Sequence, residues 1–169
     1  MVMTSGIAAS GIPQRAAQPR GTGVLTIGYE ATTVGRVVEA LADAGADHLL
    51  DVRAVPQSRK PGLSKRLLAG SLAAAGIGYT HLRGLGTPKA GRDAVRHGDV
   101  DAMRRIYATH LQTPEAQADL AQAIAVAASR RACLLCFERD HARCHRDIVA
   151  RLICEVTGAT VAHLQPKLP

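Results

Sequence analysis

The sequence has 169 residues, enough for one domain with a sizeable core, and its 47% of hydrophobic residues is ordinary for a globular protein. Only 2% of the residues are aromatic, which argues against a single-strand nucleic-acid binder that stacks bases on exposed rings. The 21 Lys and Arg against 14 Asp and Glu give a formal charge of +7, which favours an anionic partner, although an Arg-rich genome would produce the same excess.

Residues 1–22 are rich in Gly, Ala, Pro, Gln and Arg without periodicity, and we interpret them as a flexible leader before a single domain at 23–169. They lack the continuous apolar run of a secretory signal. No stretch reaches the roughly 18 apolar residues of a membrane span. We therefore expect a cytoplasmic protein without a membrane partner, whose four cysteines are reduced.

The first half of the chain alternates short apolar runs with helical periodicity. Strands are predicted at 24–27, 48–53 and 77–82. A first helix is capped by Thr32 or Thr33 and ended by Gly45. A second runs from Ser64 to a stop at Gly76, with Leu67, Leu68 and Leu72 on its buried face.

The second half begins with an irregular, glycine-rich connection, whose stretch from Gly84 to Gly98 is long enough for a lid over a site. Helices are predicted at 99–110, 114–129 and 147–157, the last burying Ile148, Leu152, Ile153 and Val156. Strands are predicted at 132–137, before the last of these helices, and at 161–164, after it. This alternation of strand and helix predicts a single α/β domain with a mainly parallel sheet flanked by helices.

Polar residues gather where the predicted strands end. These are Tyr29 with Glu30, Asp51 with Arg53, His81, and Glu138, and the loop after the second strand adds Ser58 and Arg59. Carboxyl ends of parallel strands meet at one edge of a sheet, so we expect these side chains to share one crevice.

Cys144, His145 and Arg146 stand where the last long helix is expected to begin. The helix dipole and the nearby Arg favour a thiolate at Cys144, which is how a nucleophilic cysteine is made. The same position also suits an anion held by backbone amides and Arg146, or a cysteine that only packs under the loop. A phosphatase-type loop is excluded because only one residue separates Cys144 from Arg146.

The sequence Cys133-x-x-Cys136 invites a zinc or redox interpretation, which we reject. Residues three apart in a strand point to opposite faces, so the two thiols are expected to be small core residues, as is Cys154. His81 and His145 with Cys144 and Glu138 match no zinc motif. We predict no metal and no cofactor.

Two functions fit these observations. The first is an enzyme acting on a small anionic substrate, a nucleotide, nucleoside or modified base fitting best. Its catalytic residues would be Cys144, Glu138 and Asp51, and its substrate-binding residues Tyr29, Arg53, Ser58, Arg59, His81, His145 and Arg146. Asp51 and Glu138 could act as a carboxylate pair, or each could pair with an Arg in a network that only positions loops. The second function is a non-catalytic module that binds nucleic acid or a nucleotide through the same basic edge. The sequence does not specify an oligomeric state.

Several ordered motifs resemble one protein family. They are Thr26 to Glu30, Asp51-Val52-Arg53 with Pro56, Ser58 and Arg59, Tyr79-x-His81-Leu82 with Leu85-Gly86, and Leu135 to Glu138 followed by Cys144-His145-Arg146. Together they resemble the family catalogued as domain of unknown function 488, from about Val24 to His163. The resemblance implies a small cytoplasmic α/β domain of Rossmann-like character and supplies no activity. Tyr29 departs from the family pattern, in which many members have His, so we expect no catalytic imidazole there.

Overall fold

The computed structural model describes residues 23–168, so the predicted leader at 1–22 lies outside the described residues. Five strands form one sheet in the order β3-β2-β4-β1-β5, and every pair of neighbours is parallel. The strands are β1 (Gly23–Gly28), β2 (His48–Asp51), β3 (Gly78–His81), β4 (Ala132–Cys136) and β5 (Thr160–Leu164). The predicted single α/β domain with a mainly parallel sheet is confirmed.

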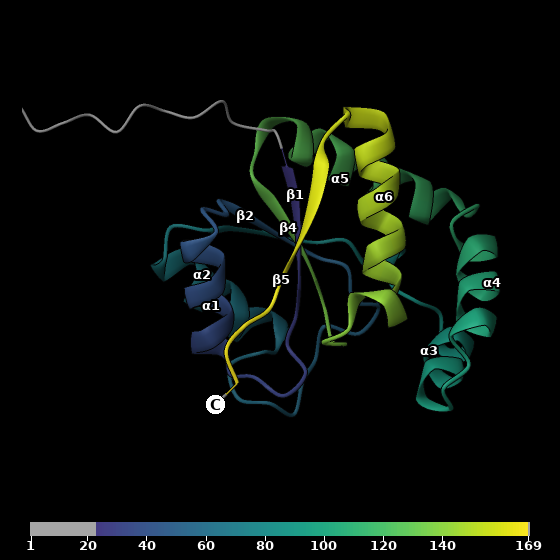
Figure 1. Cartoon of the computed structure of the whole chain (residues 1–169), viewed down its shortest axis with the longest axis horizontal. Coiled ribbons are helices and arrows are strands. Elements are labelled where there is room, and N and C mark those ends of the chain that lie inside the picture. The colour runs from purple at the N-terminus through teal and green to yellow at the C-terminus, as the bar shows by residue number, and fades with distance from the viewer. Residues whose placement is uncertain (1–22, 169) are drawn as a thin grey trace, which may run out of the picture.

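Helices cover both faces of this sheet (Figure 1). They are α1 (Val34–Asp43), α2 (Lys65–Ala74), α3 (Lys89–Arg96), α4 (Val100–His110), α5 (Pro114–Ser129) and α6 (His145–Thr157), with 3-10 turns η1 (Arg83–Leu85) and η2 (His141–Arg143). Figure 1 shows α1 and α2 on one side of the sheet and α5 and α6 on the other. No helix in the described part of the chain is long and apolar enough to cross a membrane.

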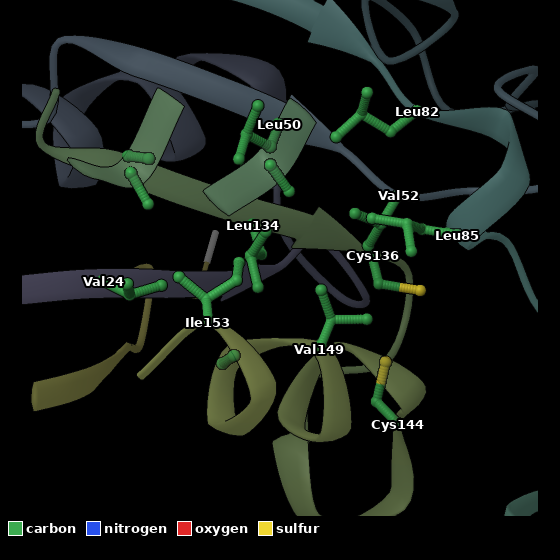
Figure 2. Packing of buried hydrophobic residues seen from close by; sticks show 14 of the residues in the cluster. Val24, Leu50, Val52, Leu82, Leu85, Leu134, Cys136, Cys144, Val149 and Ile153 are labelled. Carbon is green, nitrogen blue, oxygen red and sulfur yellow. The ribbon is translucent and has the colours of Figure 1, made fainter. Parts of the chain in front are cut away.

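The central strand β4 supplies both halves of the core. All five of its residues are buried, and their side chains alternate between the faces. Cys133 and Leu135 pack with α1 and α2, whereas Leu134 and Cys136 pack with α4, α5 and α6. The prediction that Cys133 and Cys136 point to opposite faces is therefore confirmed. Figure 2 shows from close by the part of the core that contains Leu134 and Cys136.

The chain leaves two neighbouring strands in opposite directions. From β1 it passes through α1 on one face to β2, and from β4 it passes through α6 on the other face to β5. Connections that diverge in this way leave a crevice beyond the carboxyl ends of the two strands, which is where open parallel sheets bind ligands. The residues that follow β1 and β4 line that position.

Three details differ from the sequence prediction. The connection expected to be irregular contains the eight-residue helix α3, which carries few apolar residues. The helix expected at 147–157 begins two residues earlier, at His145. Its buried residues are His145, Arg146, Val149, Ala150 and Ile153. Of the residues predicted to be buried, Ile153 is buried, Ile148 and Leu152 pack partly buried against the core, and Val156 is 67% exposed. Leu67, predicted to be buried, is also exposed because it lies on the solvent side of α2.

Candidate functional site

A cleft of about 760 Å³ opens at the point where the connections diverge, and we call it the switch-point cleft. Its lining comes from the ends of β1 and β4, the loop after β2, and α3: Tyr29, Glu30, Gln57, Ser58, Arg59, Lys60, Arg92, Val95, Arg96, Phe137, Glu138, Asp140 and Arg143. Five of these residues are cationic and three are acidic, so the cleft attracts anions.

The helix that the sequence did not predict contributes to this charge. Arg92 and Arg96 stand one turn apart on α3 and both line the cleft. Arg92 is fixed by donating to the Thr87 carbonyl at 2.6 Å, and Arg96 pairs with Asp93 at 2.9 Å. The predicted Ser58 and Arg59 also line the cleft, from the loop after β2.

The loop after β4 approaches the end of β1 very closely. The amide of Glu30 donates to the Phe137 carbonyl at 2.8 Å, so the two backbones still pair past the strands. A Cβ on Gly28 would overlap the carbonyl of Glu138. Glycine at this position therefore lets the loop carry Glu138 over the end of β1 and into the cleft.

Behind Glu138, two thiols converge on one imidazole, and we call Cys136, Cys144 and His145 the Cys–His cluster. The His145 Nε2 lies 2.8 Å from the Val52 carbonyl, an arrangement in which Nε2 carries the proton and Nδ1 faces the sulfur atoms. Nδ1 lies 3.7 Å from the Sγ of Cys136 and 3.8 Å from the Sγ of Cys144. In Figure 2 the sulfur atom of Cys144, at the start of α6, points toward Cys136 on β4.

These contacts favour charge separation within the cluster. Burial opposes a thiolate at Cys144, but the Cys136 thiol, His145 and Arg146 outweigh it and hold the pKa of Cys144 well below its usual value. Burial likewise opposes an imidazolium, but the charge of Cys144 raises the pKa of His145. Cys136 has a raised pKa because of its hydrogen bond with Cys144 and its burial. These shifts favour a thiolate at Cys144 and a proton on His145, next to a Cys136 thiol that stays neutral more readily.

Glu138 connects this cluster to the cleft. Its Oε2 accepts a hydrogen bond from the Sγ of Cys136 at 3.2 Å, and its side chain lines the cleft. Burial, followed by the negative charge of Cys144, raises the pKa of Glu138 to about 7. A carboxyl group that titrates near neutral pH is suited to proton transfer. Cys144 itself is only 3% exposed and does not line the cleft.

Asp51 and Arg53, both predicted at the site, form a buried network instead. The guanidinium of Arg53 donates to both carboxylate oxygens of Asp51, at 2.7 and 2.6 Å, and also to the hydroxyl of Tyr29 at 3.1 Å. The Tyr79 hydroxyl donates to Asp51 at 2.6 Å. This network joins the carboxyl ends of β1 and β2 to Tyr79 of β3, and its member Tyr29 lines the cleft.

Two further predicted residues lie away from the cleft. His81 lies 2.8 Å from the Arg53 carbonyl and 3.4 Å from the Lys65 amine. Arg146 is fully buried, and its guanidinium donates to the Thr26 hydroxyl and to the carbonyls of Glu138 and Arg139. Arg146 therefore holds the Glu138 loop in place, and the cleft lining does not include it.

The sequence analysis missed Cys136 as a site residue. Cys136 is a buried core residue, as predicted, but the structure also brings its thiol against Cys144, His145 and Glu138. Its position at the carboxyl end of the central strand, two residues before Glu138, was the available signal. Lys60, Arg92, Arg96 and Arg143 were missed as well, and their only signal was positive charge.

A protein-family model described as "Domain of unknown function DUF488" matches residues 33–153. The match includes the Cys–His cluster and Glu138, and it leaves out β1 and β5. A search of curated proteins gave no match. A search of solved structures also gave none.

Proposed function

The chain belongs to the DUF488 family, whose description names no activity, and we propose from its geometry that it is an enzyme acting on a small anionic substrate in the switch-point cleft. One observation carries the proposal: Glu138 lines a cationic cleft and contacts, through the Sγ of Cys136, the Cys–His cluster. The volume of about 760 Å³ suits a metabolite, since such pockets usually measure about 300–1,000 Å³.

A nucleotide, nucleoside or modified base is the substrate class that fits best. The cations of the cleft would hold a phosphate or carboxylate. Phe137 is 42% exposed and meets Tyr29 edge to face, with ring centroids 5.4 Å apart. Both rings line the cleft in a chain that is only 2% aromatic, and they offer a base or sugar an apolar surface.

We assign Glu138 as the general acid–base residue and the Cys–His cluster as the group that positions its proton. The thiolate of Cys144 lies behind Glu138, so its negative charge keeps the carboxyl group protonated up to neutral pH. Cys144 is 3% exposed, so we give it this electrostatic role rather than that of a nucleophile. Asp51 supports the cleft through Arg53 and Tyr29.

A second hollow favours an alternative, a module that binds nucleic acid. This basic hollow has a volume of about 990 Å³ and is lined by Ala54, Val55, Pro56, Gln57, Ser58, Arg59, Ser64, Lys65, Arg66 and Arg83. Its lining contains four cations and no carboxylate, and it shares Arg59 with the switch-point cleft. A longer polyanion could cross both hollows over Arg59.

Thermal shift separates the two functions. The panel contains nucleotides, nucleosides, phosphate and short oligonucleotides, and a ligand at 100 times its Kd stabilises by about 2.7 kcal/mol. Arg96→Ala removes a positive charge from the switch-point cleft, and Arg66→Ala removes one from the basic hollow. Arg105→Ala is the control, because Arg105 lines neither of them.

If the protein is an enzyme of this kind, we expect a small molecule to raise the melting temperature of the wild type, Arg66→Ala and Arg105→Ala. The same ligand should not stabilise Arg96→Ala. That ligand should then be turned over by the wild type and not by Glu138→Gln. A response to oligonucleotides only, weakened in Arg66→Ala, would favour the binding module. Full turnover by Glu138→Gln would contradict the catalytic assignment.

A further inference from the structure

The two thiols of the Cys–His cluster come from separate elements and meet only in the folded chain. Cys136 is the last residue of β4, and Cys144 directly precedes α6, with the loop 137–143 between them. Their sulfur atoms lie within 4.8 Å of each other, and all four cysteines of the chain are free thiols. The structure therefore holds a reduced pair of thiols at close range, beside the carboxyl group of Glu138.

The surroundings of the pair allow the two sulfur atoms to approach further. A disulfide bond is about 2.0 Å long, so the sulfur atoms must move together before it forms. The backbone of Cys144 is extended, and its side chain makes no capping hydrogen bond to α6, so the thiol can turn without breaking the helix. In Figure 2 this sulfur atom already points toward Cys136.

The two thiols are also unequal in the way that disulfide formation requires. Burial opposes a thiolate at Cys144, but the hydrogen bond with Cys136 and the charges of His145 and Arg146 hold its pKa well below the usual value. Cys136 keeps its proton and donates it to Glu138. A thiolate reacts with an oxidant, and a neighbouring thiol then displaces the oxidised group. Cys144 suits the first role and Cys136 the second.

Burial of the pair limits the class of oxidant. Cys136 is 5% exposed and Cys144 is 3% exposed. A thiolate that attacks a disulfide must line up with a sulfur atom that carries bulky groups, which these buried atoms do not permit. Hydrogen peroxide carries no such groups. Glu138, which lines the switch-point cleft, contacts Cys136 directly, so the cleft leads a small oxidant toward the pair.

We propose that Cys136 and Cys144 are a redox modification site, at which a small hydroperoxide forms a disulfide that switches the candidate active site off. The Cys144 thiolate attacks one peroxide oxygen, the O–O bond breaks, and the departing hydroxide takes a proton from His145 to form water. Cys144 is then a sulfenic acid. The Cys136 sulfur attacks the Cys144 sulfur, the S–O bond breaks, and the hydroxyl group leaves with the Cys136 proton as a second water. Two electrons thus pass from the thiols to the peroxide.

The disulfide removes both influences of sulfur on Glu138. Besides burial, the negative charge of Cys144 raises the pKa of Glu138, and it does so more strongly than the hydrogen bond from Cys136 lowers it. Oxidation therefore lowers the pKa of Glu138, and the carboxyl group loses its proton below neutral pH. A general acid without its proton is inactive. This consequence rests on the proposed function, whereas formation of the disulfide does not.

Peptide mapping of the full chain tests the disulfide. The reduced protein is treated with equimolar hydrogen peroxide, its remaining thiols are alkylated, and its tryptic peptides are weighed without reduction. Cys136 lies in the peptide 132–139 and Cys144 in 144–146, so the disulfide joins these peptides with the loss of two hydrogen atoms. The pair should lose its free thiols at least about tenfold faster than Cys154, whose pKa is raised by burial. Dithiothreitol should restore both thiols.

Two variants identify the thiols, because the peptide 132–139 also contains Cys133. Cys133 packs on the other face of the sheet, so Cys133→Ala is the matched control and should keep the link. Cys136→Ala should lose the link and leave Cys144 as a sulfenic acid that dimedone traps. A link that persists in Cys136→Ala, or oxidation of Cys154 ahead of the pair, would overturn the proposal. The wild-type map alone decides the matter if a variant fails to fold.

The effect on the site is measured on Glu138 itself. Carbon NMR titration should show a lower pKa for Glu138 in the oxidised protein than in the reduced protein, with reversal by dithiothreitol. A complete disulfide with an unchanged Glu138 titration would overturn the switch. Failure of the proposed function shows itself separately, as full turnover by reduced Glu138→Gln or as the absence of any small-molecule ligand for the reduced protein.

Discussion

At the scale of single residues, the proposed chemistry depends on a carboxyl group whose pKa lies near neutral pH. Two causes act on Glu138: burial, and the negative charge of Cys144 behind it. Each cause can be changed separately. The burial of Glu138 is set by the loop that carries it, whereas the negative charge is carried by the Sγ of Cys144. Three predictions test these two causes and the buried ion pair between Asp51 and Arg53.

The first concerns stability and pH. Folding raises the pKa of Glu138 to about 7 from an ordinary value of 4.5, so between these values the folded state holds a proton that the unfolded state releases. Stability should therefore fall as pH rises from 4.5 to about 7, by at most about 3 kcal/mol. Glu138→Gln should flatten this fall, and Glu155→Gln, an exposed control, should not. Urea unfolding at a series of pH values measures both.

The second tests the electrostatic role of Cys144. Cys144→Ala removes the negative charge behind Glu138, so the pKa of Glu138 should move down toward its ordinary value. Carbon NMR titration of the Glu138 carboxyl group follows this shift directly, and the pH profile of turnover should move to lower pH with it. Cys154→Ala is the matched control on the outer part of α6. An unchanged Glu138 titration in Cys144→Ala would contradict the role.

The third concerns Asp51, which the sequence suggested as a catalytic carboxylate. Its partner Arg53 is 4% exposed, so Asp51→Asn would leave a buried guanidinium without its counter-charge. We expect a loss of about 3–5 kcal/mol in the free energy of unfolding. Tyr79→Phe removes one hydrogen bond from the same network and should cost about 1–2 kcal/mol. Chemical denaturation ranks the two, and a fully stable Asp51→Asn protein would return Asp51 to the list of catalytic candidates.

At the scale of elements, the end of β1 and the loop after β4 form one unit. Gly28→Ala would push its Cβ into the Glu138 carbonyl, which is also held by Arg146. We expect a loss of about 1–3 kcal/mol and weaker ligand binding at the cleft. Gly35→Ala, with open space around its Cβ in α1, should be neutral or stabilising by up to about 1 kcal/mol. Thermal unfolding compares the pair.

The elements also show how far the sequence could predict the structure. Strands and helices with regular apolar spacing were predicted close to their bounds because burial imposes that spacing. Helix α3, with sequence KAGRDAVR, was missed since its few apolar residues give no clear stripe. On α6 the predicted Ile153 is buried and Ile148 and Leu152 pack partly buried against the core, whereas Val156 is exposed. The burial of His145 and Arg146 in its first turn was missed, because hydrogen bonds hold these polar residues inside.

The same reasoning separates the predictable and unpredictable parts of the site. Glu138 and Glu30 follow from the rule that parallel strands end at one edge. The contact between Cys136 and Cys144 depends on how α6 packs against β4, which no local pattern encodes. The sequence suggested Arg146 as a ligand contact, whereas its buried guanidinium donates to the carbonyls of Glu138 and Arg139 in the loop after β4, a long-range arrangement that no local pattern encodes.

At the scale of the whole molecule, the formal charge of +7 adds a long-range attraction to the local cations. Affinity for a nucleotide in the switch-point cleft should fall with added salt, but less steeply than affinity for an oligonucleotide that also crosses the basic hollow. Calorimetric titration over a series of KCl concentrations gives the two slopes. Equal slopes for both ligands would mean that the basic hollow takes no part in binding.

The order of strands in the sheet has a consequence for synthesis on the ribosome. The first two strands made, β1 and β2, are not neighbours; β4, made more than 80 residues after β2, fills the gap between them. A nascent chain that ends before residue 132 therefore exposes the facing edges of β1 and β2, which are open to pairing with other chains. The strand that closes this gap also carries Cys136 and leads into Glu138, so the candidate site forms only when the sheet becomes continuous.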